Sequence, residues 1–460
     1  MKPSSSTSDL LGAALFHDAD VDAAVSDQAV VAAMLDAEAA LSAAAADVGI
    51  VPRNAADAIG RACESLGGDT HIDTHIDMAA LGRESLSAGN PVPALVRRIS
   101  AAVPDSARPW VHYGATSQDV VDTALALVTR NALAHVCGHL ATAGDACAAL
   151  AQRHCDTIVI GRTLGQQAVP TTFGRKAAGW LVALDDATDR IGWVRERRLA
   201  IQFGGAVGTL AGYGDTGDIG IAAATALARR LDLACPVLPW HTDRSRVLDV
   251  ASATASAGAA TGKIATDVVL MAQTEVGEVS FARAGGSSAM PHKRNPVDAV
   301  LVRAAGVRIP GLVATLYAAA GGQEHERAAG GWHAEWAPLL DLIRIVGGMS
   351  ARTARVLAGL TVHPDRMRAN VDRTGGLVMA EAVAARLASV VGRLAAHDIV
   401  TRCADRAADD DVAFADVLLD DPDVTRHLAA DEVKAALEPA GWLGSAGAMV
   451  DRAVEAHRRR

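Results

Sequence analysis

The residues from Gly285 to Pro296 are the segment of this 460-residue chain best suited to chemistry; they read Gly-Gly-Ser-Ser-Ala-Met-Pro-His-Lys-Arg-Asn-Pro. The glycine pair permits unusual backbone angles and close approach to a ligand. Lys293 supplies a charge and Asn295 an amide donor, so the two together could hold a carboxylate. A serine in such a loop, beside backbone amides and a lysine, could be stabilised as an alkoxide. An ordinary Ser-rich linker stopped by proline would explain the same residues.

A second polar segment, Trp110 to Asp119, precedes a long helical run. Thr116 or Ser117 is a suitable N-cap for that helix. A helix N-terminus also attracts anions, because its backbone N–H groups are unpaired and the helix dipole favours negative charge there. Capping and carboxylate binding are therefore compatible roles for this loop.

The elements that must position these loops are predicted to be helices. The chain is 50% hydrophobic, mostly Ala, Val and Leu, and only 3% aromatic; Ala and Leu are strong helix formers. Leu377, Ala380, Ala384, Leu387, Val391 and Leu394 recur every three or four residues, which predicts one continuous apolar helix stripe. Strand signals are limited to a short segment, or extended loop, at Thr157 to Ile160. We therefore predict an all-α fold with three helical domains: 1–105, a central long-helix bundle at 106–355 that carries the 285–296 loop, and 356–460.

Charge, hydropathy and cysteine usage exclude several classes of protein. The net charge is −10, and apart from Arg458 to Arg460 no basic stripe is visible, so no nucleic-acid partner is expected. No uninterrupted apolar run reaches 18 residues and the first eight residues are polar, so neither a membrane span nor a secretory signal is expected. Six scattered cysteines without a C-x-x-C pair indicate reduced thiols and a cytoplasmic protein.

The loop at Gly286 to Pro296 matches every fixed position of the pattern Gly-Ser-Ser-x-Met-Pro-x-Lys-x-Asn-Pro, and so resembles the signature of the fumarase/aspartase superfamily. The resemblance covers essentially the whole chain. It implies three helical domains, a homotetramer around a central helix bundle, active sites built from several subunits, and no cofactor or metal. It also implies Ser287 as the catalytic proton donor and acceptor, with Ser288, Met290 and His292 in supporting positions, and Thr116, Ser117, Lys293 and Asn295 as carboxylate-binding residues.

A third segment, Gly161 to Gly174, is similar to one in adenylosuccinate lyases, where a histidine protonates the departing nitrogen. This chain has Leu164 at that position, and leucine transfers no proton. An amine leaves poorly without an acid, whereas a carboxylate is already a stable anion. Leu164 therefore favours a leaving or attacking group that is a weak base. Arg162, Thr163 and Gln166 of this segment are predicted to bind substrate.

Further segments resemble the branch of bacterial 3-carboxy-cis,cis-muconate cycloisomerases. They are Ala88 to Pro93, which contains Asn90; Pro239 to Thr242, which contains His241; Gln323 to Trp336, which contains Arg327; and Leu443 to Arg452. Asn90, His241 and Arg327 are accordingly predicted to bind substrate. The branch commonly has a Gln-His pair where this chain has Gln166-Gln167, and this departure leaves the exact substrate open.

Two tempting patterns are given structural interpretations instead. His71 and His75 stand at a spacing suited to a metal, but they are better read as part of a polar loop that enters a helix. Gly204 to Leu210 resembles a nucleotide-binding loop but lacks the G-x-G-x-x-G order. We interpret it as a close-packed turn near the site.

The predicted activity is the interconversion of 3-carboxy-cis,cis-muconate and 4-carboxymuconolactone in aromatic-acid catabolism, on a small di- or tricarboxylate. One alternative is β-elimination from a substituted succinate to give fumarate, with a nitrosuccinate-like substrate or, less readily, adenylosuccinate. Another is a catalytically silent structural protein of the crystallin kind.

Overall fold

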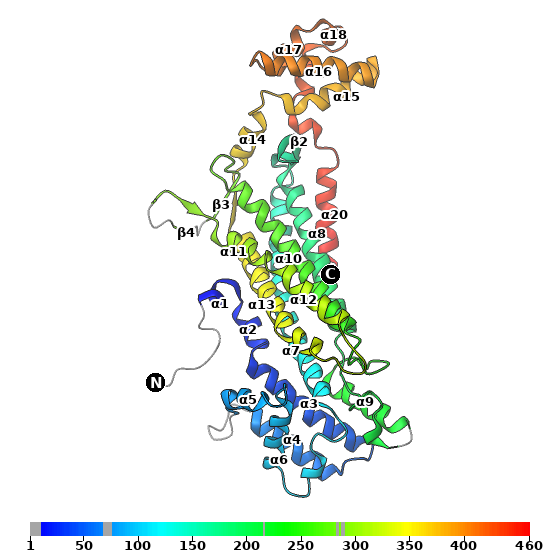
Figure 1. The fold of residues 1–460 in the computed structure, drawn as a ribbon. Coiled ribbons are helices and arrows are strands. Elements are labelled where there is room, and N and C mark those ends of the chain that lie inside the picture. The colour runs from blue at the N-terminus through cyan, green and yellow to red at the C-terminus, as the bar shows by residue number, and fades with distance from the viewer. Residues whose placement is uncertain (1–10, 68–75, 215–216, 282–284, 287–289) are drawn as a thin grey trace. The chain divides into compact units, whose positions relative to one another are not determined.

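The computed structural model describes residues 11–67, 76–214, 217–281, 285–286 and 290–460, and these are predominantly helical (Figure 1). The longest helices are α3 (Asp27–Asp47), α7 (Ser117–Arg153), α8 (Phe173–Arg197), α10 (Ser245–Met271) and α13 (Gly331–Ala358). Strands occur only as short antiparallel pairs in the described residues: β1 (Ile158–Thr163) with β2 (Gln166–Thr172), β3 (Val279–Phe281) with β6 (Leu360–Val362), and β4 (Gly285–Gly286) with β5 (Arg294–Asn295). The prediction of an all-α fold is confirmed, and the extended segment near Ile160 is the first strand of a hairpin.

The remaining helices are shorter. They are α1 (Leu11–Phe16), α2 (Ala19–Ala24), α4 (Arg53–Gly67), α5 (Met78–Ser85), α6 (Val92–Ala102), α9 (Asp218–Leu231), α11 (Val297–Gly306), α12 (Ile309–Gly321), α14 (Pro364–Asp372), α15 (Ala380–Val391), α16 (Arg393–Asp409), α17 (Phe414–Asp420), α18 (Pro422–Thr425), α19 (Ala430–Ala436) and α20 (Ala446–Arg458). Single-turn 3-10 helices are η2 (Arg108–Trp110), η3 (Ala211–Tyr213), η4 (Leu377–Met379) and η5 (Pro439–Trp442).

The chain divides into two compact units. Unit 1 comprises residues 1–140, 187–261 and 301–351, and unit 2 comprises residues 141–186, 262–300 and 352–460. Their boundaries fall inside α7, α8, α10, α11 and α13. The three sequence domains proposed above are a different division and stay a prediction.

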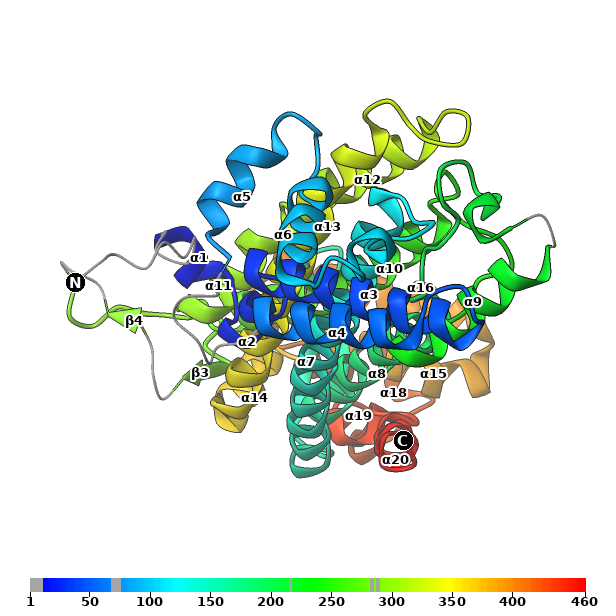
Figure 2. The same ribbon diagram turned by 90° about the horizontal axis from the view of Figure 1, so that it is seen from below.

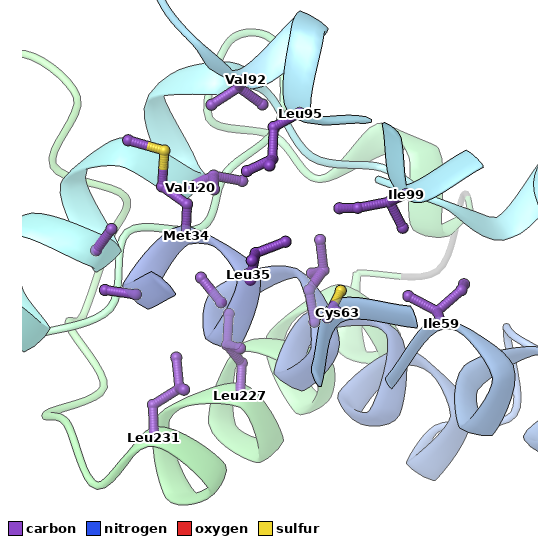
Figure 3. Close-up of a cluster of buried hydrophobic side chains, with 14 of the residues drawn as sticks. Met34, Leu35, Ile59, Cys63, Val92, Leu95, Ile99, Val120, Leu227 and Leu231 are labelled. Carbon is purple, nitrogen blue, oxygen red and sulfur yellow. The ribbon is translucent and has the colours of Figure 1, made fainter. Parts of the chain in front are cut away.

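The core of unit 1 lies where α4 and α9 pack against α3 (Figure 2). Buried residues of α6 and of the start of α7 complete it. Leu35, Ile59, Leu95 and Val120 contribute side chains from four of these helices (Figure 3). Small alanines on α3 let α4 approach closely. Burial of each large side chain contributes on the order of 1.5–3 kcal/mol, and this core supports the loop that precedes α7.

In unit 2, α15 and α16 pack against each other (Figure 1), with Leu387 and Val400 buried between them. The apolar stripe from Leu377 to Leu394 was predicted to lie on one helix, but Leu377 lies in η4, and α15 ends at Val391 before Gly392, whose φ is +84°. Glycine adopts this angle without steric cost. The chain turns there, and Leu394, the second residue of α16, is exposed.

Three helical stretches of the described chain are long and apolar enough to cross a membrane, judged by length and composition: α3, α7 and Val297–Gly321. Their mean hydropathy is high although no uninterrupted run of 18 apolar residues exists. In α3 and α7 most of the apolar window is buried in the protein, whereas only 28% of the Val297–Gly321 window is. The absence of a membrane span remains a prediction.

Candidate active site

Asp119, in the first turn of α7, organises the loop that carries Thr116 and Ser117. The carboxylate is buried. It accepts hydrogen bonds from Thr116 N (3.0 Å), Gly204 N (3.1 Å), Gly205 N (2.9 Å), Gln202 Nε2 (3.3 Å) and His241 Nε2 (2.7 Å). A carboxylate with this many donors is well compensated for its burial. These bonds fix the backbone at the N-terminus of α7, which is a suitable site for an anion.

The Gly204–Leu210 stretch is the close-packed turn that the sequence suggested. Gly205 has a φ of +68°, and a Cβ there would lie 2.9 Å from Gly114 O. Gly114 itself has a φ of +70°, and a Cβ would lie 2.4 Å from Tyr213 Cε2. Both positions require glycine sterically, because the turn packs directly against the loop before α7 and leaves no room for a Cβ.

Gln118 links His241 and Arg327 to this loop. Its Nε2 donates to His241 O at 2.9 Å, and Arg327 Nη1 donates to Gln118 Oε1 at 3.3 Å. Arg327 also donates to Ala206 O at 2.7 Å. Unit 1 therefore brings together four of the predicted substrate-binding residues, although the buried His241 uses its Nε2 on Asp119.

Below this loop, Arg244 forms a buried cluster with Asp122 and Glu335. Its guanidinium pairs with Asp122 at 2.8 Å and with Glu335 at 2.8 Å, and stacks over the Trp240 ring with 4.7 Å to the centroid. Burial opposes the charge on Arg244, but the two carboxylates outweigh it and raise the pKa of Arg244. Burial raises the pKa of Glu335, against the opposing effect of Arg244. The cluster joins α7, the segment after His241 and α13.

His112 is a residue of this region that sequence reasoning did not single out. Its Nδ1 lies 2.6 Å from Oε1 of Glu38, which is fully buried on α3. Burial alone would lower the pKa of His112, but Glu38 raises it above the ordinary value. His112 also has a φ of +57°. Its place four residues before Thr116 was the only available signal, because Glu38 is 74 residues away in sequence.

Asn90 lies in the turn before α6. Its Oδ1 accepts from Val92 N at 3.1 Å, and its Nδ2 donates to Ala88 O at 3.1 Å. These bonds form an Asx-type turn that starts the helix. The structure thus shows a local role for Asn90, and substrate binding by this residue stays a prediction.

In unit 2, the β1–β2 hairpin presents Thr163, Leu164, Gly165 and Gln166 at an exposed tip. Leu164 is fully exposed and has a φ of +50°. Arg162, just below the tip, forms two hydrogen bonds to the buried Glu278, at 3.0 and 2.6 Å. Gln167 Nε2 donates to Asn370 O at 3.1 Å.

The signature loop lies between β4 and β5, where Gly285 pairs with Asn295 and Gly286 with Arg294. Lys293 N donates to Met290 O at 3.0 Å, which closes a turn. Met290, His292 and Lys293 are exposed, and Asn295 is half-buried. Ser287 and Ser288 lie outside the described residues, as do His71 and His75.

The predicted site residues are therefore divided between the two units. Unit 1 holds Asn90, Thr116, Ser117, His241 and Arg327, and unit 2 holds Arg162, Thr163, Gln166, Met290, His292, Lys293 and Asn295. The arrangement in unit 1 can bind a carboxylate through hydroxyl and backbone N–H donors. The segments in unit 2 offer a lysine, amides and an apolar hairpin tip.

Comparison with known proteins identifies relatives that align with most of the chain. Residues 16–311 match a family described as Lyase, and residues 376–453 match one described as Adenylosuccinate lyase C-terminus. Nitrosuccinate lyase of Streptomyces davaonensis is 44% identical over 447 residues, covering 94% of this chain and 92% of that protein. The 3-carboxy-cis,cis-muconate cycloisomerase of Pseudomonas aeruginosa is 43% identical over 451 residues, covering 96% and 95%. The crystal structure of 3-carboxy-cis,cis-muconate lactonizing enzyme from Pseudomonas putida superposes with a TM-score of 0.88 at 41% identity, covering 98% of this chain and 99% of that one.

Proposed function

The chain belongs to the lyase family of the fumarase/aspartase superfamily, and from this premise we propose that it is a cycloisomerase that interconverts 3-carboxy-cis,cis-muconate and 4-carboxymuconolactone. Several relatives with this activity in their names align with nearly the full chain. The reaction would place the enzyme in the catabolism of aromatic acids, in the cytoplasm, without a cofactor.

The observation that favours the proposal over an amine-releasing lyase is Leu164 at the hairpin tip. A fully exposed leucine replaces the acid that amine-releasing members of the superfamily use. Lactone opening expels a carboxylate, which leaves without protonation because it is a weak base. The chemistry therefore requires proton transfer at carbon but not at the leaving oxygen.

In the lactone-forming direction, a carboxylate oxygen of the substrate attacks the β-carbon of the alkene. The C–O bond forms as the alkene electron pair moves toward the α-carbon and its attached carboxylate, which becomes an aci-carboxylate. Thr116, Ser117, Lys293 and Asn295 would stabilise this charge as preorganised donors. Ser287 would then deliver its proton to the α-carbon; in the reverse direction the Ser287 alkoxide removes that proton and the lactone C–O bond breaks.

Self-association as a homotetramer with shared sites is part of the proposal. Val297–Gly321 is strongly apolar but mostly unburied within one chain, and Val300, Val307 and Tyr317 are exposed on it. Large exposed apolar patches are typical of protein interfaces, and these residues are candidates for one. Sedimentation analysis of the purified protein tests the oligomeric state.

A second candidate is elimination of nitrite from nitrosuccinate to give fumarate. The 44% identity to nitrosuccinate lyase supports it. Nitrite is also a weak base, so Leu164 is compatible with this reaction as well.

The deciding experiment follows the ultraviolet absorbance of 3-carboxy-cis,cis-muconate on addition of the protein, with the lactone identified as product. Rapid loss of the diene absorbance supports the cycloisomerase. No loss from a folded tetramer rejects it, and fumarate formation from nitrosuccinate is then measured.

Ser287→Ala should lower turnover by about 10²–10⁴-fold and leave folding intact, whereas Ser389→Ala, on an exposed face of α15, serves as the control. A protein inactive on both substrates would favour the structural alternative.

A further inference from the structure

We propose that Glu278 and Asn370 are positioning residues that hold the β1–β2 hairpin tip in place, and that Arg162 acts through them and does not bind substrate. We call Arg162, Gln167, Glu278 and Asn370 the hairpin clamp. The proposal rests on the proposed function in one respect, namely that the tip residues 163–166 face the substrate.

The first arm of the hairpin clamp is the fork between Arg162 and Glu278. Nη1 and Nη2 of Arg162 donate to separate carboxylate oxygens of Glu278, at 3.0 and 2.6 Å. The Glu278 side chain is completely buried, and that of Arg162 is 30% exposed. A bidentate arginine–carboxylate pair fixes orientation as well as charge. The pair uses two of the five N–H donors of the arginine and fixes the guanidinium against Glu278, so the position of Arg162 follows that of the buried carboxylate.

The second arm ties the opposite strand to α14. Gln167 Nε2 donates to Asn370 O at 3.1 Å. The side chain of Asn370 donates in turn to Glu278 Oε1 at 2.9 Å and to Val276 O at 2.8 Å. The two arms therefore meet at one buried carboxylate, and α14 packs along β1.

The register of the hairpin shows why these arms matter for the tip. Arg162 and Gln167 are Cα partners across the two strands, and Thr163 and Gln166 form the next and last pair. The hairpin clamp thus contacts both strands at Arg162 and Gln167, the pair next to the tip. The four tip residues are exposed, and the nearest side-chain bonds to the buried residues Glu278 and Asn370 start from this pair.

The bulge of the hairpin lies in β2, opposite Gly161. Between the pairs Ile160–Pro170 and Arg162–Gln167, β1 has one residue and β2 has two, so the extra residue belongs to β2. Gly161 lies at the shift, and a Cβ there would be 2.7 Å from Val169 O. The extra residue in β2 thus makes Gln167 the partner of Arg162, so that both arms of the hairpin clamp start from one cross-strand pair.

The test compares Arg162→Gln, Glu278→Gln and the double variant in the full-length protein. If Arg162 only positions the tip, each single variant should lower kcat/KM by roughly ten-fold or more, mainly through kcat, and the double variant should be no worse than either single variant. If Arg162 instead binds substrate, Arg162→Gln should raise KM strongly, Glu278→Gln should leave activity within about two-fold, and the losses should not coincide. The second pattern overturns the proposal.

Hydrogen–deuterium exchange of residues 158–172, without substrate, gives a readout that does not depend on the proposed function. The hairpin clamp predicts faster exchange in all three variants, and unchanged exchange contradicts it even if no substrate is found. Gln167→Ala removes the second arm without leaving Glu278 unpaired, so it serves if the Arg162 or Glu278 variants do not fold; it should also accelerate exchange. Arg406→Gln, which breaks the exposed pair between Arg406 of α16 and Asp420 of α17, is the matched control and should change neither activity nor exchange in the hairpin.

Discussion

His112 Nδ1 lies 2.6 Å from Glu38 Oε1, so an imidazole in the loop before α7 is hydrogen-bonded to a fully buried carboxylate of α3. The pairing raises the pKa of His112 in the folded protein. A raised folded-state pKa means that the folded protein binds this proton more tightly than the unfolded chain does. The pair therefore stabilises the fold fully below the unfolded pKa of about 6.5, and this contribution is lost as the pH rises through the higher folded value.

We expect His112→Gln to lower Tm most below about pH 6.5, and progressively less at higher pH. The measurement is the difference in Tm between wild type and variant from pH 5.5 to 9. His135→Gln, on an exposed part of α7, is the control. A difference that is constant across this range would show that proton binding by His112 contributes nothing to stability.

The buried cluster of Arg244, Asp122 and Glu335 gives a second prediction. Arg244→Met leaves two buried carboxylates facing each other, and breaking a buried ion pair costs about 3–5 kcal/mol. Because burial already raises the pKa of Glu335, protonation of Glu335 in acid should partly offset the loss of stability in the variant. Thermal unfolding should therefore show a larger loss of Tm at pH 8 than at pH 5. Arg53→Met, which removes an exposed partner of Asp47, should change Tm little at either pH, and equal losses for Arg244→Met would contradict the argument.

Two glycines that differ in their surroundings give a third prediction. Gly114→Ala would force a Cβ to 2.4 Å from Tyr213 at a φ of +70°. The loop before α7 should then shift and activity should fall by more than about ten-fold. Gly138→Ala, at an exposed position inside α7 with no atom within 4 Å of the added Cβ, should instead stabilise by about 1 kcal/mol. Activity and Tm of both variants are the measurements; full activity in Gly114→Ala would mean that the loop geometry is not required.

The sequence predicted the helical class because helix propensity and apolar periodicity are local properties. It missed the helix break at Gly392 because a single glycine interrupts a stripe only when its backbone adopts a positive φ, and the apolar spacing carries no information on that angle. Thr116 or Ser117 was recognisable as the N-cap of a long helix, and α7 begins at Ser117. The buried partners that hold the site were not, since Glu38 lies 74 residues from His112 and Glu278 lies 116 residues from Arg162. Such pairs are set by tertiary packing.

Leu164 permits a direct test of why the hairpin tip lacks an acid. Leu164→His should fold normally, because the position is fully exposed and histidine tolerates a positive φ better than leucine does. If the reaction simply needs no proton donor at the tip, turnover of the carboxylate-releasing substrate should fall by less than about ten-fold, with a new inflection in the pH–rate profile near about 6.5. Leu164→Ala separates the two properties of the side chain, since it removes apolar surface without adding a titratable group. If both variants lose activity by about a thousand-fold, the leucine itself must contact the substrate in the assembled site, and its apolar surface, not the absence of an acid, determines which substrates react.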